Sequence, residues 1–576
     1  MTDTTTTPTS VANGDEPADI LLQGGRVIDV ESRSVDKIDI GIVGDRIVLG
    51  AVDGKKIIDL EGAYVSPGFI DAHMHVESTM LPPSSFANLA VPHGTTSVIL
   101  DPHEIANVLG IGGIKLLMDD AVGIPIDCFF AASSCVPASP LETSGATLLA
   151  DDLEPLFEDE RVIALAEVMN FPAVIKGDLE ILKKISLGLK YGVVDGHCPG
   201  LCGEDLLKYV AVGISSDHES TTADEAVEKL EAGLQIYIRE GSAAKNLEAL
   251  LPIITPGNAH RICFCTDDRH PADLRDEGHI DHIIRLAIKG GLDPVLAICI
   301  ATKHVADHFR LPNHGMIETG RLANLVVFDD LASPTPRQTW HHGKLVASGA
   351  KMIEQSTSSI DWSSAKDSVH LPEQFSPSSF QITGTDGSIR VIGLVEGQLY
   401  TEELICDARV EDGNIIADPE KDVLKLAVVE RHHNTGNIGL GFVQGFQFRN
   451  GAIASTVGHD AHNIAVVGDN DDDMHIAAVV LAEAGGGHCV VCEGDVKALL
   501  PLPIAGLMSD AGPDCVISQQ EDVLVAASSL GCTMDDPFMP LSFLPLSVIP
   551  KLKLTDLGLV DVDQFKIVPL QIGSPS

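Results

Sequence analysis

Residues 67–79 read PGFIDAHMHVEST, an apolar run that ends in two histidines one residue apart. In a strand, residues i and i+2 point to the same face, so His73 and His75 project side by side from the end of a buried strand. Two neutral imidazoles in this arrangement make half of a metal site. A pair of surface histidines gives the same pattern, so the rest of the chain has to decide between the two interpretations.

The composition is that of a large, acidic, globular chain of more than one domain. Its 576 residues are 44% hydrophobic and 21% charged but only 4% aromatic, which predicts a core of Val, Ile, Leu and Ala. There are 38 basic and 83 acidic residues, a formal charge of −45. A field of this sign repels phosphate backbones and anionic membranes. We therefore expect a neutral or cationic small molecule as the partner, and neither nucleic acid nor a membrane.

Neither the cysteines nor the first residues indicate export. Twelve cysteines in a chain of this length do not make a disulfide framework, and the Cys489-x-x-Cys492 motif has no second pair. Residues 1–17 lack the basic and apolar regions of a signal peptide, and no window has the ~18 apolar residues of a membrane span. We expect a cytoplasmic protein with a disordered tail over residues 1–17.

Short β-rich runs alternate with helical stretches between residues 67 and 317. The predicted strands are 69–75, 95–101, 126–132, 162–168, 192–196, 213–216, 234–238 and 261–266. Eight such units within about 200 residues predict a (β/α)₈ TIM-like barrel. Catalytic groups in such barrels lie at the carboxyl ends of the strands.

Three further segments surround the predicted barrel. Residues 18–66 and 318–352 have β texture, and we expect them to form one small β-sandwich domain, with hairpin turns at Gly24-Gly25 and Gly44-Asp45. Residues 353–379 are polar and Ser-rich, which predicts a linker. Residues 380–576 are predicted to form a separate C-terminal α/β or α+β domain.

Polar residues stand at the ends of five of the eight predicted strands. A histidine after a Gly-rich turn is often a solvated loop residue, and Asp267 could be a helix N-cap. If these strand ends meet at one barrel mouth, their histidines and carboxylates are enough to hold two divalent ions, with Glu167 between the ions. They are His73, His75, Glu167, His197, His218, Asp267 and Asp268.

Longer motifs carry a resemblance to a known family. PGFIDAHMH after a small β unit, and GRLANLVVFDD after the barrel, resemble the amidohydrolase superfamily. HMHVEST, GTTSVILDPHEIANVLG, LAEVMN, DGHCPG, SDHES, FCTDDRHP and GAIASTVGHDAHNIAVVG resemble its bacterial and archaeal adenine deaminases. The similarity covers nearly everything after residue 18. Many superfamily members carry a carboxylated lysine where this chain has Glu167, which argues against the dihydroorotase-like and hydantoinase-like branches.

The resemblance implies a site and a reaction. The implied reaction is the hydrolytic deamination of adenine to hypoxanthine and ammonia in purine salvage, with a metal-bound hydroxide attacking C6. The implied cofactor is a pair of divalent ions, with Mn²⁺ favoured and Fe²⁺ or Zn²⁺ compatible with ligands that are all N or O. We choose Asp267 over Asp268 as the eighth-strand ligand. The implied ligands are His73, His75, Glu167, His197, His218 and Asp267.

Further residues at the mouth are candidates for proton transfer and substrate contact. Asp267 is expected to carry a proton from the attacking water to the leaving amine, and Glu167 to share this role. His103 and Glu104 either protonate the purine ring or support the histidine ligands. The substrate-binding candidates are Arg239, Glu240, Ser242 and Asp268, with an Arg239–Glu240 salt bridge as the alternative.

Several alternatives stay open at this point. The C-terminal histidines of ERHHNTG and GHDAHN, including His459 and His462, could form a second metal site, a polar turn or a lid over the mouth. The substrate could be another cyclic amidine or amide such as cytosine, guanine or a dihydropyrimidine, or the nucleoside adenosine. A non-catalytic scaffold on the same fold is the alternative of a different class. A homodimer is expected from base rates.

Overall fold

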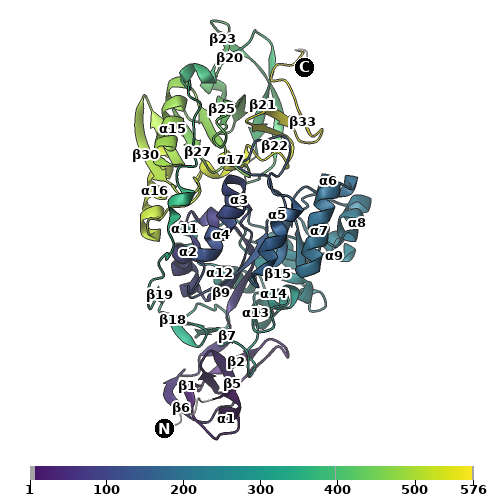
Figure 1. Ribbon diagram of the computed structural model, residues 1–576, viewed down its shortest axis with the longest axis vertical. Coiled ribbons are helices and arrows are strands. Elements are labelled where there is room, and N and C mark those ends of the chain that lie inside the picture. The colour runs from purple at the N-terminus through teal and green to yellow at the C-terminus, as the bar shows by residue number, and fades with distance from the viewer. Residues whose placement is uncertain (1–6, 396, 574–576) are drawn as a thin grey trace.

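The computed structural model of the chain describes residues 7–395 and 397–573. Three units follow one another along the long axis of the molecule (Figure 1). A small β domain lies at one end, a barrel in the middle and a β-rich C-terminal domain at the other end. None of the helices in this described part of the chain combines the length and the apolar character that a membrane crossing needs.

Eight parallel strands form the barrel, as predicted. Five of them pair in the order β12-β11-β10-β9-β8, and three in the order β13-β14-β15. A parallel bridge between Met74 and Asp267 joins the first strand to the last, and the Ser215 N–H donates to the Val194 carbonyl across the other seam at 2.9 Å. The strands are β8 (Phe69–Met74), β9 (Thr95–Leu100), β10 (Asp127–Ala132), β11 (Val162–Val168), β12 (Val193–Gly196), β13 (Ser216–Asp217), β14 (Gln235–Arg239) and β15 (Ile262–Cys265).

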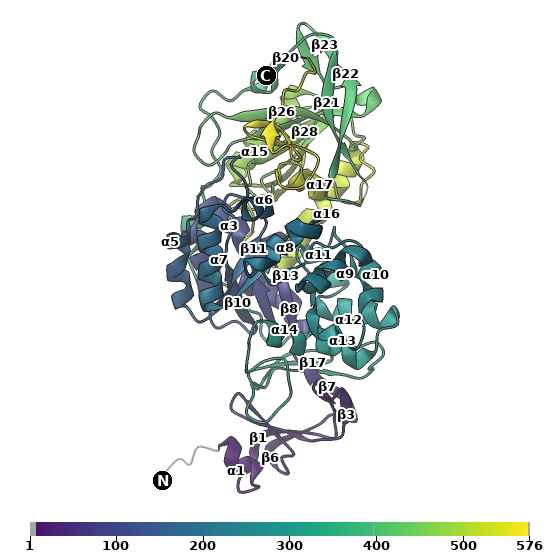
Figure 2. The ribbon, with the colours of Figure 1, turned by 90° about the vertical axis from the view of Figure 1, so that its right-hand side faces the viewer.

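Helices surround the barrel, as Figure 2 shows for α7 (Leu179–Tyr191), α8 (Gly203–Ala211), α9 (Ala223–Ala232) and α12 (Ile280–Lys289). The inside is filled by small and branched side chains such as Ile70, Ala72 and Ala164, all fully buried. Tyr237 of β14 is also buried there and donates to Asp195 at 2.7 Å. The low aromatic content of the sequence agrees with an interior filled mostly by small and branched side chains.

The small β domain is assembled from segments on both sides of the barrel in the sequence. A four-stranded sheet contains β1 (Ala18–Gln23), β4 (Ile40–Val43), β5 (Arg46–Leu49) and β6 (Gly54–Asp59). A seven-stranded sheet joins β2 (Arg26–Asp29), β3 (Ser34–Asp36) and β7 (Tyr64–Pro67) to β16 (Leu325–Phe328), β17 (Gln338–His341), β18 (Lys344–Ser348) and β19 (Lys351–Met352). Leu22, Ile40, Leu325 and Trp340 share the core between the two sheets.

Two expectations for the amino-terminal part need correction. Gly44-Asp45 does connect the antiparallel strands β4 and β5. Gly24-Gly25 instead carries the chain from one sheet to the other, because β1 and β2 belong to different sheets. In the predicted disordered tail, residues 1–6 lie outside the described residues, whereas Pro8–Ala12 form helix α1 and bury Val11.

The C-terminal domain is built on an eight-stranded sheet in the order β22-β21-β26-β25-β28-β27-β29-β30. All but one of its neighbouring pairs are antiparallel. Helix α15 (Asp471–Ala484) packs on one face and α16 (Pro513–Ser529) on the other. Of the two predicted classes, this arrangement is α+β. The sheet strands are β21 (Ser388–Leu394), β22 (Thr401–Asp407), β25 (Val423–Val429), β26 (Ile438–Gln444), β27 (Gly451–Ser455), β28 (Ile464–Gly468), β29 (Gly487–Cys492) and β30 (Asp495–Pro501).

Residues 353–379, predicted to be a linker, run between barrel and C-terminal domain and are held along their path. Trp362 and Ala365 are buried with the barrel core, and Val369 with the core of the C-terminal domain. The backbone N–H of Ser356 donates to the Asn88 side chain at 2.7 Å. The segment between the barrel and the C-terminal domain is therefore packed against both units along its length.

Candidate active site

The polar residues predicted at the strand ends meet at the barrel mouth that faces the C-terminal domain. His73 belongs to β8 and Glu167 to β11. His75, His197 and His218 follow directly after their strands, and Asp267 follows β15 after one residue. All six side chains are at least nine-tenths buried. Parallel strands deliver these groups to one rim, because every carboxyl end in a closed barrel lies on the same side.

Glu167 lies at the centre of this group. One carboxylate oxygen is 3.4 Å from His75 Nε2 and 3.7 Å from His73 Nε2. The other oxygen is 2.6 Å from His197 Nδ1 and 3.3 Å from His218 Nε2. The carboxylate thus has one histidine pair on each oxygen, the arrangement expected of a group that bridges two ions.

Asp267 closes the first half of the site. Its Oδ1 is 3.1 Å from His75 Nε2 and 3.6 Å from His73 Nε2, and its Oδ2 accepts from the Arg239 guanidinium at 2.7 Å. Asp267 has a φ of 60°, which is uncommon for a residue other than glycine and turns the chain sharply after β15. The structure places Asp267, not Asp268, against the histidines.

Buried partners fix the positions of these groups. Asp71, completely buried on the first strand, accepts from the Thr266 hydroxyl at 2.6 Å and so holds β8 and β15 in register beneath the rim. The Asp101 carbonyl is 3.0 Å from His75 Nδ1, which leaves Nε2 of that ring facing the site. The rim is therefore supported by contacts from neighbouring strands.

The electrostatics of the cluster favour ionised carboxylates. Burial alone would raise the pKa of Glu167, but His197 and His218 outweigh it and hold that pKa well below its usual value. For Asp267, burial is likewise outweighed, chiefly by Arg239. Anionic carboxylates beside imidazoles are the form in which both residue types bind metals.

The donor set fits divalent metal. His73 Nε2 is buried and makes no hydrogen bond to any described residue, so a cation would supply its missing partner. His73, His75 and Asp267 form one compact group of donor atoms, and His73, Glu167 and His218 form another. No thiolate takes part, and nitrogen and oxygen donors are those of Mn, Fe and Zn sites.

Two carboxylates beside the cluster were not predicted. Glu219 forms a donor group with His197 and His218, and it is ion-paired with Arg239. Asp101 forms a donor group with His75, His103 and Glu167. Both stand in quoted motifs, SDHES and LDPHE, so their position next to a predicted rim residue was a signal that could have found them.

His103 and Glu104 lie where the barrel meets the C-terminal domain. Glu104 is 2.7 Å from His459 Nδ1 and is also in contact with His462 Nε2. His103 Nδ1 is 3.3 Å from the Asp101 carboxylate and 3.7 Å from Glu167. The C-terminal histidines therefore complete the environment of a barrel residue. Of the three alternatives left open for them, this geometry favours a position over the mouth.

The predicted substrate-binding residues fall into two groups. Asp268 accepts from the Ser78 hydroxyl and lines a cavity between the barrel and the C-terminal domain. Arg239 instead joins Glu219 to Asp267, and these ion pairs replace the Arg239–Glu240 salt bridge that was the alternative to substrate contact. Glu240 accepts from the Leu247 backbone N–H at 3.1 Å, so its side chain is turned into its own loop. The Ser242 hydroxyl donates to Asp273 in helix α11 (Pro271–Asp276), the segment that follows β15.

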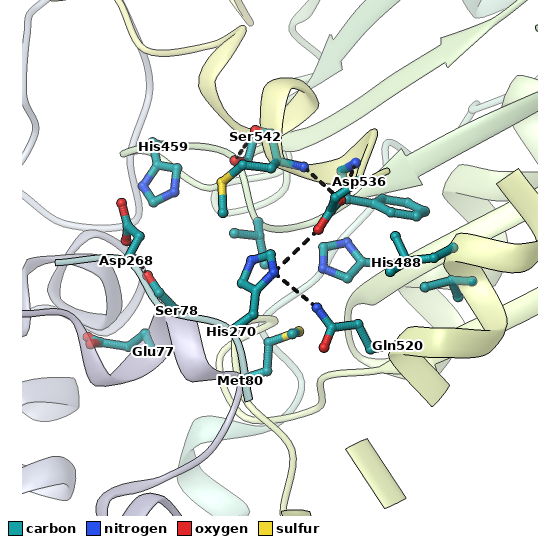
Figure 3. A pocket seen from close by; sticks show the side chains of 15 residues that line it. Glu77, Ser78, Met80, Asp268, His270, His459, His488, Gln520, Asp536 and Ser542 are labelled. Carbon is teal, nitrogen blue, oxygen red and sulfur yellow. Dashed lines mark hydrogen bonds and ion pairs between the residues drawn. The ribbon is translucent and has the colours of Figure 1, made fainter. Parts of the chain in front are cut away.

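Figure 3 shows this cavity, with Glu77, Asp268 and His459 on one side and His488 and Asp536 on the other. Glu77 has one carboxylate oxygen that is buried and makes no hydrogen bond to a described residue. Burial and the nearby Glu104 raise the pKa of Glu77 to about 7. His270 Nδ1 lies 3.3 Å from Asp536 and 3.0 Å from the Gln520 amide, so barrel and C-terminal domain both shape the cavity.

Fold and site together define a class of protein. Residues 64–351 match the amidohydrolase family, and residues 398–566 match the adenine deaminase C-terminal domain. The chain is thus a hydrolase that acts on a C–N bond of a cyclic amidine.

Relatives with high sequence identity show which family within this class of hydrolases the chain belongs to. The chain is 44% identical over 566 residues to an adenine deaminase of Desulfatibacillum aliphaticivorans, covering 97% of this chain and 98% of the relative. It is 45% identical to an adenine deaminase of Brucella anthropi, covering 96% and 98%, and 43% identical to one of Nitratidesulfovibrio vulgaris, covering 98% of each. The chain belongs to the adenine deaminase family, which confirms the resemblance seen in its motifs.

Proposed function

We propose that this chain hydrolyses adenine to hypoxanthine and ammonia at the barrel rim. The observation that carries the proposal is the position of Glu167, with one pair of histidines on each carboxylate oxygen and Asp267 beside the first pair. Two divalent ions fit this arrangement, with Mn²⁺ favoured and Fe²⁺ or Zn²⁺ as alternatives. Their proposed ligands are His73, His75, Glu167, His197, His218 and Asp267.

The metal supplies one part of the chemistry: a bound divalent ion lowers the pKa of water and so provides a nucleophile near neutral pH. The protein has to move two protons. Asp267 Oδ1 lies among the ligands while Oδ2 is fixed by Arg239, so the carboxylate is oriented to accept a proton from the attacking water. It then returns that proton to the amine that leaves C6.

A second proton has to reach ring nitrogen N1, and the acid that donates it regains a proton from the C6 hydroxyl as the carbonyl of hypoxanthine forms and ammonia leaves. The Glu104 carboxylate is occupied by contacts with His459 and His462, so it positions these C-terminal histidines. His103 is the candidate proton donor that lies nearer to Glu167. Glu77 is a further candidate, because it lines the cavity with a free oxygen atom. A carboxyl group in this position can donate to a ring nitrogen of adenine.

The test is a metal analysis of the purified protein combined with assays of ammonia release. We expect adenine to be turned over, with higher activity after addition of Mn²⁺. Adenosine, cytosine and guanine serve as the comparison substrates. Preferential turnover of any of these would contradict the substrate assignment, and absence of turnover of every base would favour a scaffold. A homodimer and a cytoplasmic location stay predictions from the sequence.

A further inference from the structure

A second group of histidines surrounds one carboxylate at the opposite end of the barrel from the rim. Asp127 is the first residue of β10, and His341 is the last residue of β17 in the small β domain. His342 follows in the turn to β18, and His314 lies in the segment between helix α14 (Lys303–His308) and β16. We call Asp127, His314, His341 and His342 the bottom cluster.

All three imidazoles direct Nε2 at the same carboxylate. His314 Nε2 is 3.0 Å from Asp127 Oδ2, and the Nε2 atoms of His341 and His342 are 3.1 and 3.0 Å from Oδ1. In a tetrahedral site with metal–nitrogen bonds of about 2.0–2.1 Å, neighbouring donor atoms are about 3.3 Å apart. The three nitrogen–oxygen separations are close to that value. The donor atoms of Asp127, His341 and His342 form one compact group, into which a small ion fits, and His314 lies on the other carboxylate oxygen.

Hydrogen bonding alone does not satisfy the cluster. The His341 side chain is nine-tenths buried, and its Nε2 makes no hydrogen bond to a described residue although Asp127 is near. The rings of His341 and His342 stack with their centroids 4.0 Å apart, which brings two nitrogen atoms to one oxygen. A cation between them supplies the missing partner of His341 and separates the crowded donors.

The surrounding backbone is built to hold this arrangement. Consecutive residues of a strand point to opposite faces, but His342 has a φ of 47° and so turns its ring back beside His341. The His342 N–H donates to the Asn324 side chain at 2.8 Å, and the Asn324 amide donates to Asp127 at 2.9 Å. Gly343 completes the turn, since a Cβ there would lie 2.3 Å from the Gly44 carbonyl oxygen.

We propose that the bottom cluster binds one divalent ion of the zinc class. Asp127, His341 and His342 supply three donors without a thiolate, and His314 lies beside the second carboxylate oxygen as the candidate for a fourth. Imidazole and carboxylate donors are typical of zinc and neighbouring first-row metals. The ligands come from a barrel strand, a connecting segment and the small β domain. The ion therefore ties the small β domain to the barrel and has no part in the chemistry at the rim.

The experiment measures zinc content and zinc-dependent stability of the full-length chain. The protein is freed of metal with a chelator, titrated with Zn²⁺ and followed by Tm and by elemental analysis. We expect His341→Asn and His342→Gln each to bind one equivalent fewer than wild type and to lose part of the zinc-dependent rise in Tm. The His342 side chain is 39% exposed, so we expect His342→Gln to fold even if His341→Asn does not, and the zinc measurement can then be made on that variant.

Two controls separate this site from the rim and from general effects of mutation. His308→Asn removes a comparably buried histidine at the end of α14, whose nearest carboxylate is 3.9 Å away, and it should bind as much zinc as wild type. Glu167→Gln changes the rim only. The double variant Glu167→Gln/His342→Gln should therefore bind one equivalent of zinc fewer than Glu167→Gln alone. Unchanged zinc content in both bottom-cluster variants would overturn the proposal and leave a hydrogen-bonded network around Asp127.

Discussion

The rim of the barrel and its opposite end both gather histidines around a buried or half-buried carboxylate, yet they are assembled differently. The rim takes its groups from strand ends of a single barrel. The bottom cluster takes its groups from a barrel strand, a connecting segment and another domain. A site of the first kind follows from one topological rule, whereas a site of the second kind depends on how two domains dock.

The rim should be the place where one substitution abolishes turnover. Glu167→Gln keeps the shape but loses the charge shared by four histidines, so we expect kcat/KM to fall by roughly 10³-fold or more. Steady-state assays and metal analysis check this result. Glu142→Gln is the matched control, because Glu142 is a buried barrel carboxylate that binds the Ser139 N–H and lies outside the rim cluster. Wild-type rates for Glu167→Gln would contradict the bridging role.

Substitution of Arg239 tests how far turnover depends on the ion pairs that hold the rim carboxylates in position. Arg239→Lys removes a guanidinium that joins Glu219 to Asp267, and an ammonium cannot replace both contacts. We expect kcat to fall by about 10–100-fold through misplacement of Asp267, with a smaller change in KM.

Arg269→Lys is the control for Arg239→Lys. Arg269 is equally buried, and its partners are Glu277 and two backbone carbonyls, none of which belongs to the rim cluster. A large rise in KM with unchanged kcat for Arg239→Lys would instead favour direct contact with substrate.

The interface between barrel and C-terminal domain should give an intermediate effect. His459→Ala leaves Glu104 with fewer partners, at a cost of about 1–3 kcal/mol in the free energy of unfolding, and it opens the cavity wall. We expect KM to rise about tenfold, an estimate that corresponds to about 1.4 kcal/mol of binding. Denaturant unfolding and initial rates measure the two effects.

His433→Ala provides the comparison for the interface. His433 also reaches the barrel, where its Nε2 lies 2.9 Å from the Ser144 carbonyl, but it does not contact Glu104. If His459→Ala and His462→Ala both kept wild-type kinetics and metal content, a role of the C-terminal histidines in the site would have to be abandoned.

The smallest effect on turnover is expected at the bottom cluster. His341→Asn lies at the far end of the barrel from Glu167, so kcat/KM should stay within about twofold of wild type while Tm falls. Assays at a temperature well below both transitions, together with calorimetry, check this separation. A loss of activity as large as that of Arg239→Lys would show that the two ends of the barrel are coupled.

Much of the fold and of the rim could be predicted because barrel strands impose a strong local pattern. Each of the eight predicted strands has a counterpart, but the strand predicted at 213–216 shares only Ser216 with the two-residue β13 (Ser216–Asp217). The Gly24-Gly25 signal predicts a hairpin wrongly, because it specifies a change of direction but not which sheet receives the next strand.

The parts that sequence did not predict depend on docking between distant segments. Glu104 and His462 are 358 residues apart, and no local pattern says that they meet. The same holds for Asp127 and His341, which have no shared motif. The position of Glu240 and Ser242 after a strand predicts contact with substrate, but Glu240 binds a backbone N–H of its own loop and Ser242 binds Asp273 of helix α11.

The contact of Glu104 with His459 has a consequence for the order of events during biosynthesis. Residues 73–267, which carry the rim, leave the ribosome long before residue 459, and domains generally begin to fold as they emerge. A nascent barrel therefore exposes Glu104 without its C-terminal partners. The enzyme becomes complete only when the last domain has been translated and has closed over the opening.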